Sequence, residues 1–394
     1  MLRAAVTAAS LGSVWSSYAR PYTATFARHE TFHPRYGWLK KGVDLIDRNP
    51  AAFASDDVHM DLGVGKNMAH AIRYWCEAFG LIAPAPAGRA GRGVRPEGSP
   101  LRWEGYQLTT TARDLIAGAQ ALDPYLESTA TLWWLHYKLI QTQKATTWNF
   151  VIDHFGRPTF TAEQLLEDLK RFVQVTYPDH KVAESSLAKD VQLFLRMYAF
   201  DDQGTGGAGG RGRHDAVGGA ARAPFHEDSI DSPFVELGLL NKRGELYSFV
   251  TGSKPTLPDA VIAAAVLDFA SVTLRPSPVS PLESLSKRNS FRATDVALRQ
   301  AQGDENTGSK SISFTELMSA DASPVKAFRL TENALYDALE RVISASSSPS
   351  GRRGQGVRDL FISDTAGVKQ LSWKGEAKKL AYQLLKKYYN HALS

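Results

Sequence analysis

A short run near the start of the chain combines residue types that hydrolytic enzymes use. His29, Glu30 and His33 match the pattern H-E-x-x-H, in which two histidines one helical turn apart bind zinc and the glutamate activates water. Pro34 follows at once, and the residue before a proline is kept out of helical geometry. The motif needs an unbroken helix, so a zinc peptidase is the weaker interpretation of this run.

Cations follow the same run. Arg35, Lys40 and Lys41 come shortly after His29 and Glu30. A base or metal ligand beside cations suits phosphodiester hydrolysis, because the cations stabilise the charge that develops on the phosphate. We predict His29, Glu30 and Arg35 to be catalytic, with a divalent cation (Mg²⁺ or Mn²⁺) as cofactor and with Lys40 and Lys41 on phosphate. The alternative is a buried, hydrogen-bonded network that shapes the N-terminal fold.

Residues 63–67 resemble the end of a phosphate-binding loop. Met60 replaces the leading glycine of that motif, and Asn67 stands where a serine or threonine would hold magnesium. Nucleotide hydrolysis is therefore rejected. Glycines at the start of a helix instead let backbone amides and Lys66 approach a phosphate, helped by the positive end of the helix dipole.

Two further patterns have ordinary explanations. Asp359 or Asp364, together with Glu376 and Lys378, imitates a nuclease-like D…E-x-K set in which carboxylates hold a metal and the lysine positions water. Such spacings are frequent at the start of a lysine-rich helix, so a solvated helix is preferred. Asp153 begins the sequence D-H-F-G, which is expected to form a turn.

Residues 62–81 are predicted to form one amphipathic helix, at about 100° per residue. Its apolar side carries Met68, Ile72, Trp75, Cys76 and Phe79. Its polar side carries Lys66, His70, Arg73 and Glu77. Residues 106–115 then predict a short strand that leads into another helix, which is typical of a helix-turn-helix with a wing. The predicted DNA contacts of this unit are Lys66, Asn67, His70 and Arg73.

A similar pattern recurs downstream. Thr161 and Gln164 predict a capping box at the start of a helix that runs through Val173. Residues 185–198 predict the next helix, and residues 237–250 predict two strands around a tight turn, as a wing would form. The apolar side of the 185–198 helix carries Leu187, Val191, Phe194 and Tyr198. Its polar side is the second predicted DNA surface, with Lys189, Gln192 and Arg196.

A third copy is predicted in the C-terminal part. It consists of residues 314–317, a helix over 331–343 and a hairpin over 360–373, and a lysine-rich helix over 375–389 closes the chain. Stretches rich in Gly, Ser, Pro or Arg are expected to be loops. These are residues 83–100, 201–224 and 344–356. Residues 286–313 are expected to lack strong order.

Together the patterns predict a mainly α (α+β) protein of tandem winged helix-turn-helix units, joined by helical segments and flexible loops. The predicted divisions are an N-terminal extension (1–22), a winged-helix DNA-binding domain (23–120), a helical connector (121–160), a second winged-helix unit with a Gly/Arg-rich loop at 201–224 (161–252) and a C-terminal helical and winged domain (253–394).

Composition limits the classes of protein to which the chain can belong. Its 394 residues include 46 Lys and Arg against 41 Asp and Glu, a formal net charge of +5, which permits nucleic-acid binding. The single cysteine, Cys76, excludes a disulfide framework and a cysteine-rich zinc module within one chain. No acidic residue and no long apolar stretch occur in residues 1–20, so a secretory signal is not expected. No apolar run approaches the ~20 residues of a membrane span, and a cytoplasmic protein is expected.

Several blocks, in this order, resemble a bacterial domain family, DUF4007. They are residues 26–41, residues 62–68, residues 72–75, the helix start at Leu108 and residues 123–133. The similarity is densest over residues 23–150. Members of the family accompany DNA phosphorothioation systems, which put sulfur into the DNA backbone, and the chain is most similar to members that nick DNA.

This resemblance implies a DNA-nicking endonuclease of phosphorothioate modification and phage defence. The alternative is a non-catalytic DNA adaptor that recruits the sulfur-transfer enzymes. The implied partners are DNA and other phosphorothioation proteins, with no membrane. Winged-helix proteins commonly dimerise, so a homodimer is expected, with the aromatic helix of residues 123–140 as its candidate surface.

Overall fold

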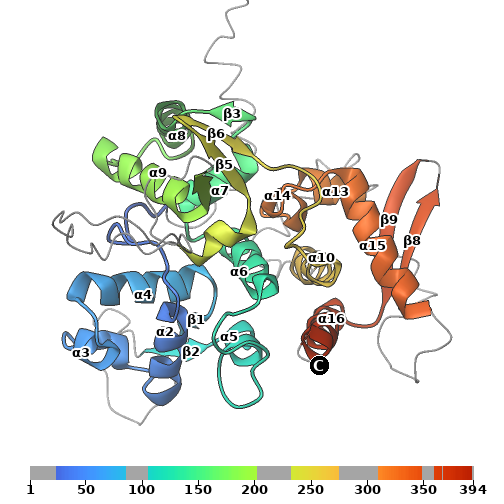
Figure 1. Ribbon diagram of the computed structural model, residues 1–394, viewed down its shortest axis with the longest axis horizontal. Coiled ribbons are helices and arrows are strands. Elements are labelled where there is room, and N and C mark those ends of the chain that lie inside the picture. Colours follow the sequence, from blue (N-terminus) through green and yellow to red (C-terminus); the bar gives the residue numbers. More distant parts are fainter. Residues whose placement is uncertain are drawn as a thin grey trace, which may run out of the picture. The chain divides into compact units, whose positions relative to one another are not determined.

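The computed structural model describes residues 24–85, 105–201, 232–274, 309–347, 359–365 and 367–392. They belong to two compact units, one ending at Val250 and the other starting at Thr251. Both units are mainly helical and carry small sheets (Figure 1), so the predicted α+β class is confirmed. Among the described residues, no helix combines the length and apolar character that crossing a bilayer requires.

Several predicted segments lie outside the described residues. The N-terminal extension (1–22) is one of them, and the Gly/Arg-rich loop at 201–224 is another except for Asp201. Most of the predicted loops at 83–100 and 344–356 also lie outside.

The first unit opens with three packed helices and a strand pair. The helices are α2 (Trp38–Arg48), α3 (Val58–Leu62) and α4 (Lys66–Ala78), and the strands are β1 (Ile82–Pro84) and β2 (Tyr106–Leu108). A short 3-10 turn, η1 (Ala52–Ala54), lies between α2 and α3. β1 pairs antiparallel with β2, with Ile82 opposite Leu108. As predicted, the strand leads into a helix, α5 (Thr110–Leu115), whose first turn is capped by the Thr109 side chain.

The prediction of one helix over residues 62–81 is wrong at its start. α3 ends at Leu62, and Gly63 adopts a left-handed φ of 62°, which glycine reaches without the steric cost of a Cβ atom. α4 begins at Lys66, after Gly65. The two glycines therefore end one helix and allow a second to start in a new direction.

The two faces predicted for this segment are confirmed within α4 and the residue that follows it. On the apolar side, Ile72, Trp75, Cys76 and Phe79 are completely buried, and Met68 is half-buried. On the polar side, Lys66, Asn67 and His70 are exposed, and Arg73 and Glu77 are half-buried.

Close packing between α2 and α4 sets the position of α4. A Cβ atom built on Gly42 of α2 would lie 2.5 Å from Cys76 Sγ and 3.0 Å from Ile72 Cγ2, both on α4. A side chain at position 42 would therefore push the two helices apart. Glycine here allows the backbone of α2 to approach α4 directly.

The rest of the first unit contains a four-stranded sheet and its helices. The helices are α6 (Thr129–Thr142), α7 (Thr146–Asn149), η2 (Phe150–His154), α8 (Ala162–Thr176), α9 (Glu184–Tyr198) and η4 (Pro233–Leu237). The strands are β3 (Thr159–Phe160), β4 (Ala199–Asp201), β5 (Leu240–Arg243) and β6 (Leu246–Phe249), in the order β3-β6-β5-β4. β4 runs parallel to β5, and the other pairs are antiparallel.

The predicted local signals of this region are confirmed. Thr161 Oγ1 accepts a hydrogen bond from the Gln164 backbone at 3.3 Å, and Gln164 Oε1 accepts one from the Thr161 backbone at 3.0 Å, which completes the capping box. The following helix, α9, begins at Glu184, one residue before the predicted start. The predicted strand pair around a tight turn is β5 and β6.

The aromatic helix proposed as a dimer surface is buried instead. In α6, Trp133, Leu135 and Tyr137 are completely inaccessible and Trp134 is nearly so. Because the helix is apolar around most of its circumference, it serves as a core element of the first unit. This correction removes residues 123–140 as an exposed aromatic face, although Tyr125 in the preceding loop is exposed.

The second unit is organised around the apolar helix α10 (Asp259–Thr273), which packs against α15 (Glu332–Ser347) and α16 (Ala377–Ala392). Its sheet consists of β7 (Ser309–Ser313), β8 (Leu360–Thr365) and β9 (Val368–Lys374), antiparallel in the order β7-β9-β8. The short helices α13 (Phe314–Ser319) and α14 (Pro324–Ala327) lie between β7 and α15 in the chain. Of the segment 286–313, which was expected to lack strong order, residues 286–308 lie outside the described residues. The strand β7 corrects this expectation for residues 309–313, since Ile312 is buried opposite Leu371.

The contact between Gly42 and Cys76 generates a stability prediction. Gly42→Ala gains at most about 1 kcal/mol of helix propensity, but overpacking a tight core costs about 1–3 kcal/mol. We expect Gly42→Ala to lower the free energy of unfolding, and Cys76→Ala to cost less in the Gly42→Ala background than in wild type, because it removes the clashing sulfur. Urea denaturation of the four proteins measures both effects. A stabilised Gly42→Ala variant, or strictly additive effects, would contradict this packing account.

Candidate functional site

The H-E-x-x-H run is a turn and not a helix. Residues 28–31 form this turn, and Glu30 and Thr31 have positive φ angles of 50° and 68°. Ala27, directly before it, has a φ of 53°. Each left-handed non-glycine residue costs about 1–2 kcal/mol, so this turn persists only because other contacts hold it.

Those contacts converge on a buried carboxylate. His29 Nε2 donates to Asp190 Oδ1 at 2.7 Å, and the backbone N–H of Ala27 donates to the same oxygen at 2.8 Å. Thr147 Oγ1 donates to the other oxygen, Asp190 Oδ2, at 2.7 Å. His29 Nδ1 accepts from the backbone N–H of Thr31 at 3.1 Å, so the ring proton lies on Nε2. We call these residues the Asp190 network.

The Asp190 network is sealed from solvent. The exposed fractions of His29 and Asp190 are 1 % and 2 %. The His29 ring also lies against aromatic rings, at centroid distances of 6.3 Å to Trp75 and 5.9 Å to Trp148. This geometry matches the alternative of a buried, hydrogen-bonded network. Whether His29 also takes part in hydrolysis stays a prediction.

The other predicted catalytic residues lie closer to the surface. Glu30 and Arg35 are half-buried. The Arg35 guanidinium lies over the rings of Phe32 and Trp38, at 5.6 and 5.2 Å from their centroids. His33 is buried, and its Nδ1 is 3.2 Å from the carbonyl oxygen of Pro34. The two histidines of the motif are therefore held by separate partners.

The two lysines that follow have structural partners as well. Lys41 is exposed, and its Nζ donates to the carbonyl of Leu62, at the end of α3, at 3.0 Å. Lys40 Nζ pairs with Asp44 at 2.5 Å and lies 5.9 Å from the centroid of the Tyr125 ring. Lys41 thus ties α2 to α3, and Lys40 points into a hollow beside α2.

This hollow, of about 590 Å³, is open to solvent and mixes acidic and basic side chains. It is lined by Lys40, Asp44, Asp47, Arg48, Gly118, Ala119, Pro124 and Tyr125. Tyr125 is 67 % exposed. Carboxylate oxygens are the ligands that Mg²⁺ prefers, and adjacent cations suit a phosphate group. Two carboxylates lie near the Arg48 guanidinium here, and one of them, Asp44, is already paired with Lys40.

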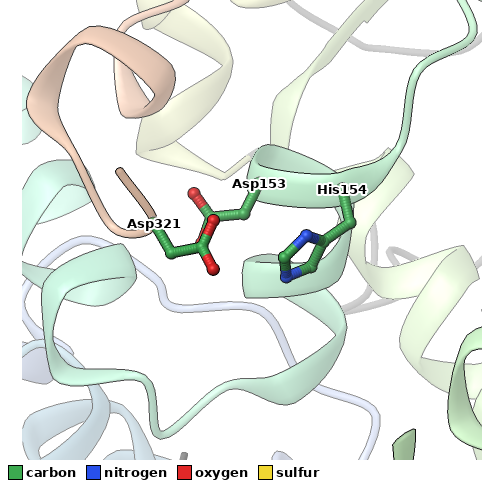
Figure 2. A group of neighbouring side chains, drawn as sticks. All are labelled: Asp153, His154 and Asp321. Carbon is green, nitrogen blue, oxygen red and sulfur yellow. The ribbon is translucent and has the colours of Figure 1, made fainter. Parts of the chain in front are cut away.

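A second acidic position lies at the end of η2. Asp153 and His154 close this π-helical turn, both half-buried (Figure 2), and the His154 ring stacks on Phe172 with a centroid distance of 5.4 Å. The expected simple turn is thus a wide helical turn, of a kind that recurs at functional sites. Asp321, also labelled in Figure 2, belongs to the second unit, where it pairs with Lys326 Nζ at 2.9 Å.

The predicted DNA-contacting side chains lie on exposed helix faces. On α4 these are Lys66, Asn67 and His70, with Arg73 half-buried. On α9, Lys189, Gln192 and Arg196 are all exposed, and the opposite residues Leu187, Val191, Phe194 and Tyr198 are buried. The predicted exposure of the α9 face is confirmed. Contact of either face with DNA stays a prediction.

Sequence reasoning missed Asp190, the centre of the network. It occupies a position on the apolar side of α9, between Leu187 and Val191. A charged residue in a buried helical stripe needs a partner inside the protein. The carboxylate among apolar positions was the signal that the sequence offered. It indicates a buried polar partner, which in the structure is His29 of the H-E-x-x-H run.

The D…E-x-K pattern of the second unit separates in space where it uses Asp364. Asp364 of β8 lies opposite Lys369 in the strand register, whereas at the other end of β9 the backbone N–H of Lys374 donates to the backbone carbonyl of Asp359. At about 3.3 Å per strand residue, Asp364 lies roughly 17 Å along the hairpin from the end that leads to Glu376. One metal ion cannot bind both carboxylates. Only Asp359 lies at the correct end.

The chain is similar to one protein family and to two solved structures. Residues 26–301 and 293–389 match the family described as "Protein of unknown function (DUF4007)". Two solved structures are similar, described as "SspB crystal structure" and "Magnesium ion-bound SspB crystal structure". Each is 30 % identical over 94 % of this chain and 90 % of the other, with TM-scores of 0.68 and 0.67. No curated protein matches the chain.

The Asp190 network generates a second prediction. Because Asp190 accepts three hydrogen bonds in the interior, we expect Asp190→Ala to cost about 3 kcal/mol of unfolding free energy. His29→Ala should be destabilising too, and the double variant should lose less than the sum. Denaturation followed by tryptophan fluorescence measures this, since Trp75 and Trp148 lie beside His29.

The exposed His70→Ala variant is the control and should stay within about 0.5 kcal/mol of wild type. Wild-type stability of His29→Ala would rule out the structural role of the network.

Proposed function

The chain belongs to the DUF4007 family, and from this and its likeness to SspB we propose that it is a DNA-nicking protein of a bacterial phosphorothioation system that also serves phage defence. The observation that carries the proposal is the similarity to SspB, which extends over 94 % of the chain. Exposed basic helix faces and carboxylates near cations support it. The proposal places the protein in the cytoplasm, where it meets DNA and the other phosphorothioation proteins.

We assign α2, α3, α4, β1 and β2 to a winged helix-turn-helix. Three packed helices followed by an antiparallel strand pair are the elements of this DNA-binding motif. α4 takes the place of the helix that enters the major groove. Its exposed Lys66, Asn67 and His70 lie in the first turns, where such helices contact base edges and phosphates.

A second winged unit contributes α9. β3 precedes α8 and α9, and it pairs with β6, the second strand of the following hairpin. α9 then takes the place of the recognition helix, with Lys189, Gln192 and Arg196 toward DNA. Two such faces in one chain give a longer footprint on the duplex and a steeper dependence on salt than one face gives.

For hydrolysis, Glu30 acts as the base or metal ligand, and Arg35 is the cation that stabilises phosphate charge. His29 has a positioning role, because its hydrogen bond to Asp190 holds the strained turn that carries Glu30. A divalent cation, Mg²⁺ or Mn²⁺, supplies Lewis-acid activation of the phosphate when bound. Magnesium is the ion described for one of the similar SspB structures.

The ligands of that ion come from one of two places in the first unit. One is Glu30, next to the buried network. The other is the hollow beside α2, where Asp44 and Asp47 offer oxygen ligands and Arg48 offers a phosphate partner. Substitutions can test the two places separately, because Asp47 is exposed and lies outside the Asp190 network.

The burial of His29 favours a second candidate function. A side chain that is 1 % exposed does not reach a phosphodiester, so the chain acts as a DNA-binding adaptor for sulfur-transfer enzymes if no other residue hydrolyses DNA. A homodimer remains part of both proposals. Its surface must lie outside the buried helix α6.

The nicking assay separates the two functions. We expect purified protein with Mg²⁺ or Mn²⁺ to convert supercoiled plasmid to open circles, and EDTA to abolish the conversion. Glu30→Gln should lower the nicking rate at least about tenfold if Glu30 acts as base or ligand, with unchanged DNA binding. Asp47→Asn serves as the matched test of the hollow, since it removes one carboxylate charge at an exposed position.

The outcomes of this assay distinguish the two candidate cation sites and the two candidate functions. Loss of nicking in Asp47→Asn but not in Glu30→Gln would transfer the cation site to the hollow. Folded wild-type protein that binds duplex DNA yet leaves plasmid intact would reject the nickase in favour of the adaptor, and protein that neither binds nor nicks would reject both.

A further inference from the structure

The last helix of the second unit carries an unusual concentration of positive charge. α16 contains Lys378, Lys379, Lys386 and Lys387 and no acidic residue. All four lysines are exposed, and none of them forms an ion pair or hydrogen bond with a described residue. For comparison, the formal net charge of the whole chain is +5.

The geometry of α16 gathers part of this charge into one line. Lys379 and Lys386 are about two helical turns apart, roughly 10 Å along the axis, on the same side of the helix. Gln383 lies between them on this side, and Asn390 continues the line by one turn. Amides between ammonium groups are the side chains that proteins use to contact successive phosphates. We call this line the α16 stripe.

The side of α16 opposite the stripe is buried in the second unit. Leu380, Leu384, Leu385 and Tyr389 are buried, and α16 packs on α10. A helix that binds a membrane surface needs a free apolar side to insert among lipids. α16 has none, so the chemistry that fits the stripe is a polyanion that can be contacted by charge and hydrogen bonds alone.

The charge of α15, another helix of the second unit, differs from that of α16. The order α10, β7, α13, α14, α15, β8 and β9, with β9 between β7 and β8, resembles that of a winged helix with the short helix α14 added. α15 takes the place of its recognition helix, yet it exposes Asp337 and Glu340. Its Glu332 is paired with Lys369, and its one cation, Arg341, is paired with Asp259. The exposed carboxylates would repel phosphates, so the usual DNA face of such a unit is unsuitable here.

We infer that the second unit contacts the nucleic-acid phosphate backbone through the α16 stripe and not through α15. The inference rests on the proposed DNA-binding function and adds a third surface to the faces of α4 and α9. Since both stripe lysines are unpaired among the described residues, they bring full positive charge to the phosphates and release counterions from DNA.

The test is the salt dependence of DNA binding by the full chain. Binding of a fluorescent DNA duplex of arbitrary sequence is measured by anisotropy at several salt concentrations. Lys379→Gln with Lys386→Gln should lower the slope of log K against log salt by roughly 2, because each phosphate contact contributes about 0.9. Affinity at low salt should fall by about tenfold or more.

A matched control removes the same charge from elsewhere in the unit. Lys310→Gln with Lys369→Gln takes away one exposed lysine of β7 and one lysine paired with Glu332 at 2.8 Å. This variant should keep the wild-type slope. Thermal unfolding checks that both double variants remain folded, which is expected because all four positions lie outside the core.

The failures of the inference and of the proposed function are distinguishable. If Lys66→Ala with Arg73→Ala weakens binding while the α16 variant keeps the wild-type slope, the inference is overturned and DNA binding stands. If wild type fails to bind duplex at low salt, both are overturned. Binding to phosphatidylserine vesicles that depends on the α16 lysines, without any effect on DNA binding, would replace the inference with a membrane contact.

Discussion

The buried pairing of Asp190 with His29 is the interaction on which the architecture of the first unit depends. A carboxylate in the interior is costly unless it is paired and hydrogen-bonded, and Asp190 accepts bonds from three donors on two other segments. It therefore joins the N-terminal turn, α7 and α9. The same bonds hold a turn whose positive φ angles would not persist in isolation.

This constraint connects the candidate chemistry with the candidate DNA face. α9 offers Asp190 to the interior and Lys189, Gln192 and Arg196 to solvent, so one helix fixes the turn that carries Glu30 and presents cations outward. On α4, Trp75 lies against His29, while Lys66 and His70 face solvent. A distortion of the Asp190 network would therefore disturb both helices together.

Periodicity and capping signals predicted much of this fold, because they depend on local chemistry. The capping box at Thr161, the apolar sides of α4 and α9 and the hairpins follow from residues within one or two turns of each other. Two features depend on contacts distant in sequence and were missed: the partner of His29 at Asp190 and the strand β7 opposite β9. For the site, the sequence identified the buried histidine but not whether it faced substrate or core.

Lysine footprinting by acetylation and mass spectrometry, with and without duplex DNA, tests the central claim that these helix faces bind DNA. The account predicts that DNA protects Lys66 of α4 and Lys189 of α9. Lys170 of α8, which pairs with Glu167 and Glu184 at 2.9 and 2.6 Å, should react equally in both conditions. Equal reactivity of Lys66 and Lys189 with and without bound DNA would contradict the account.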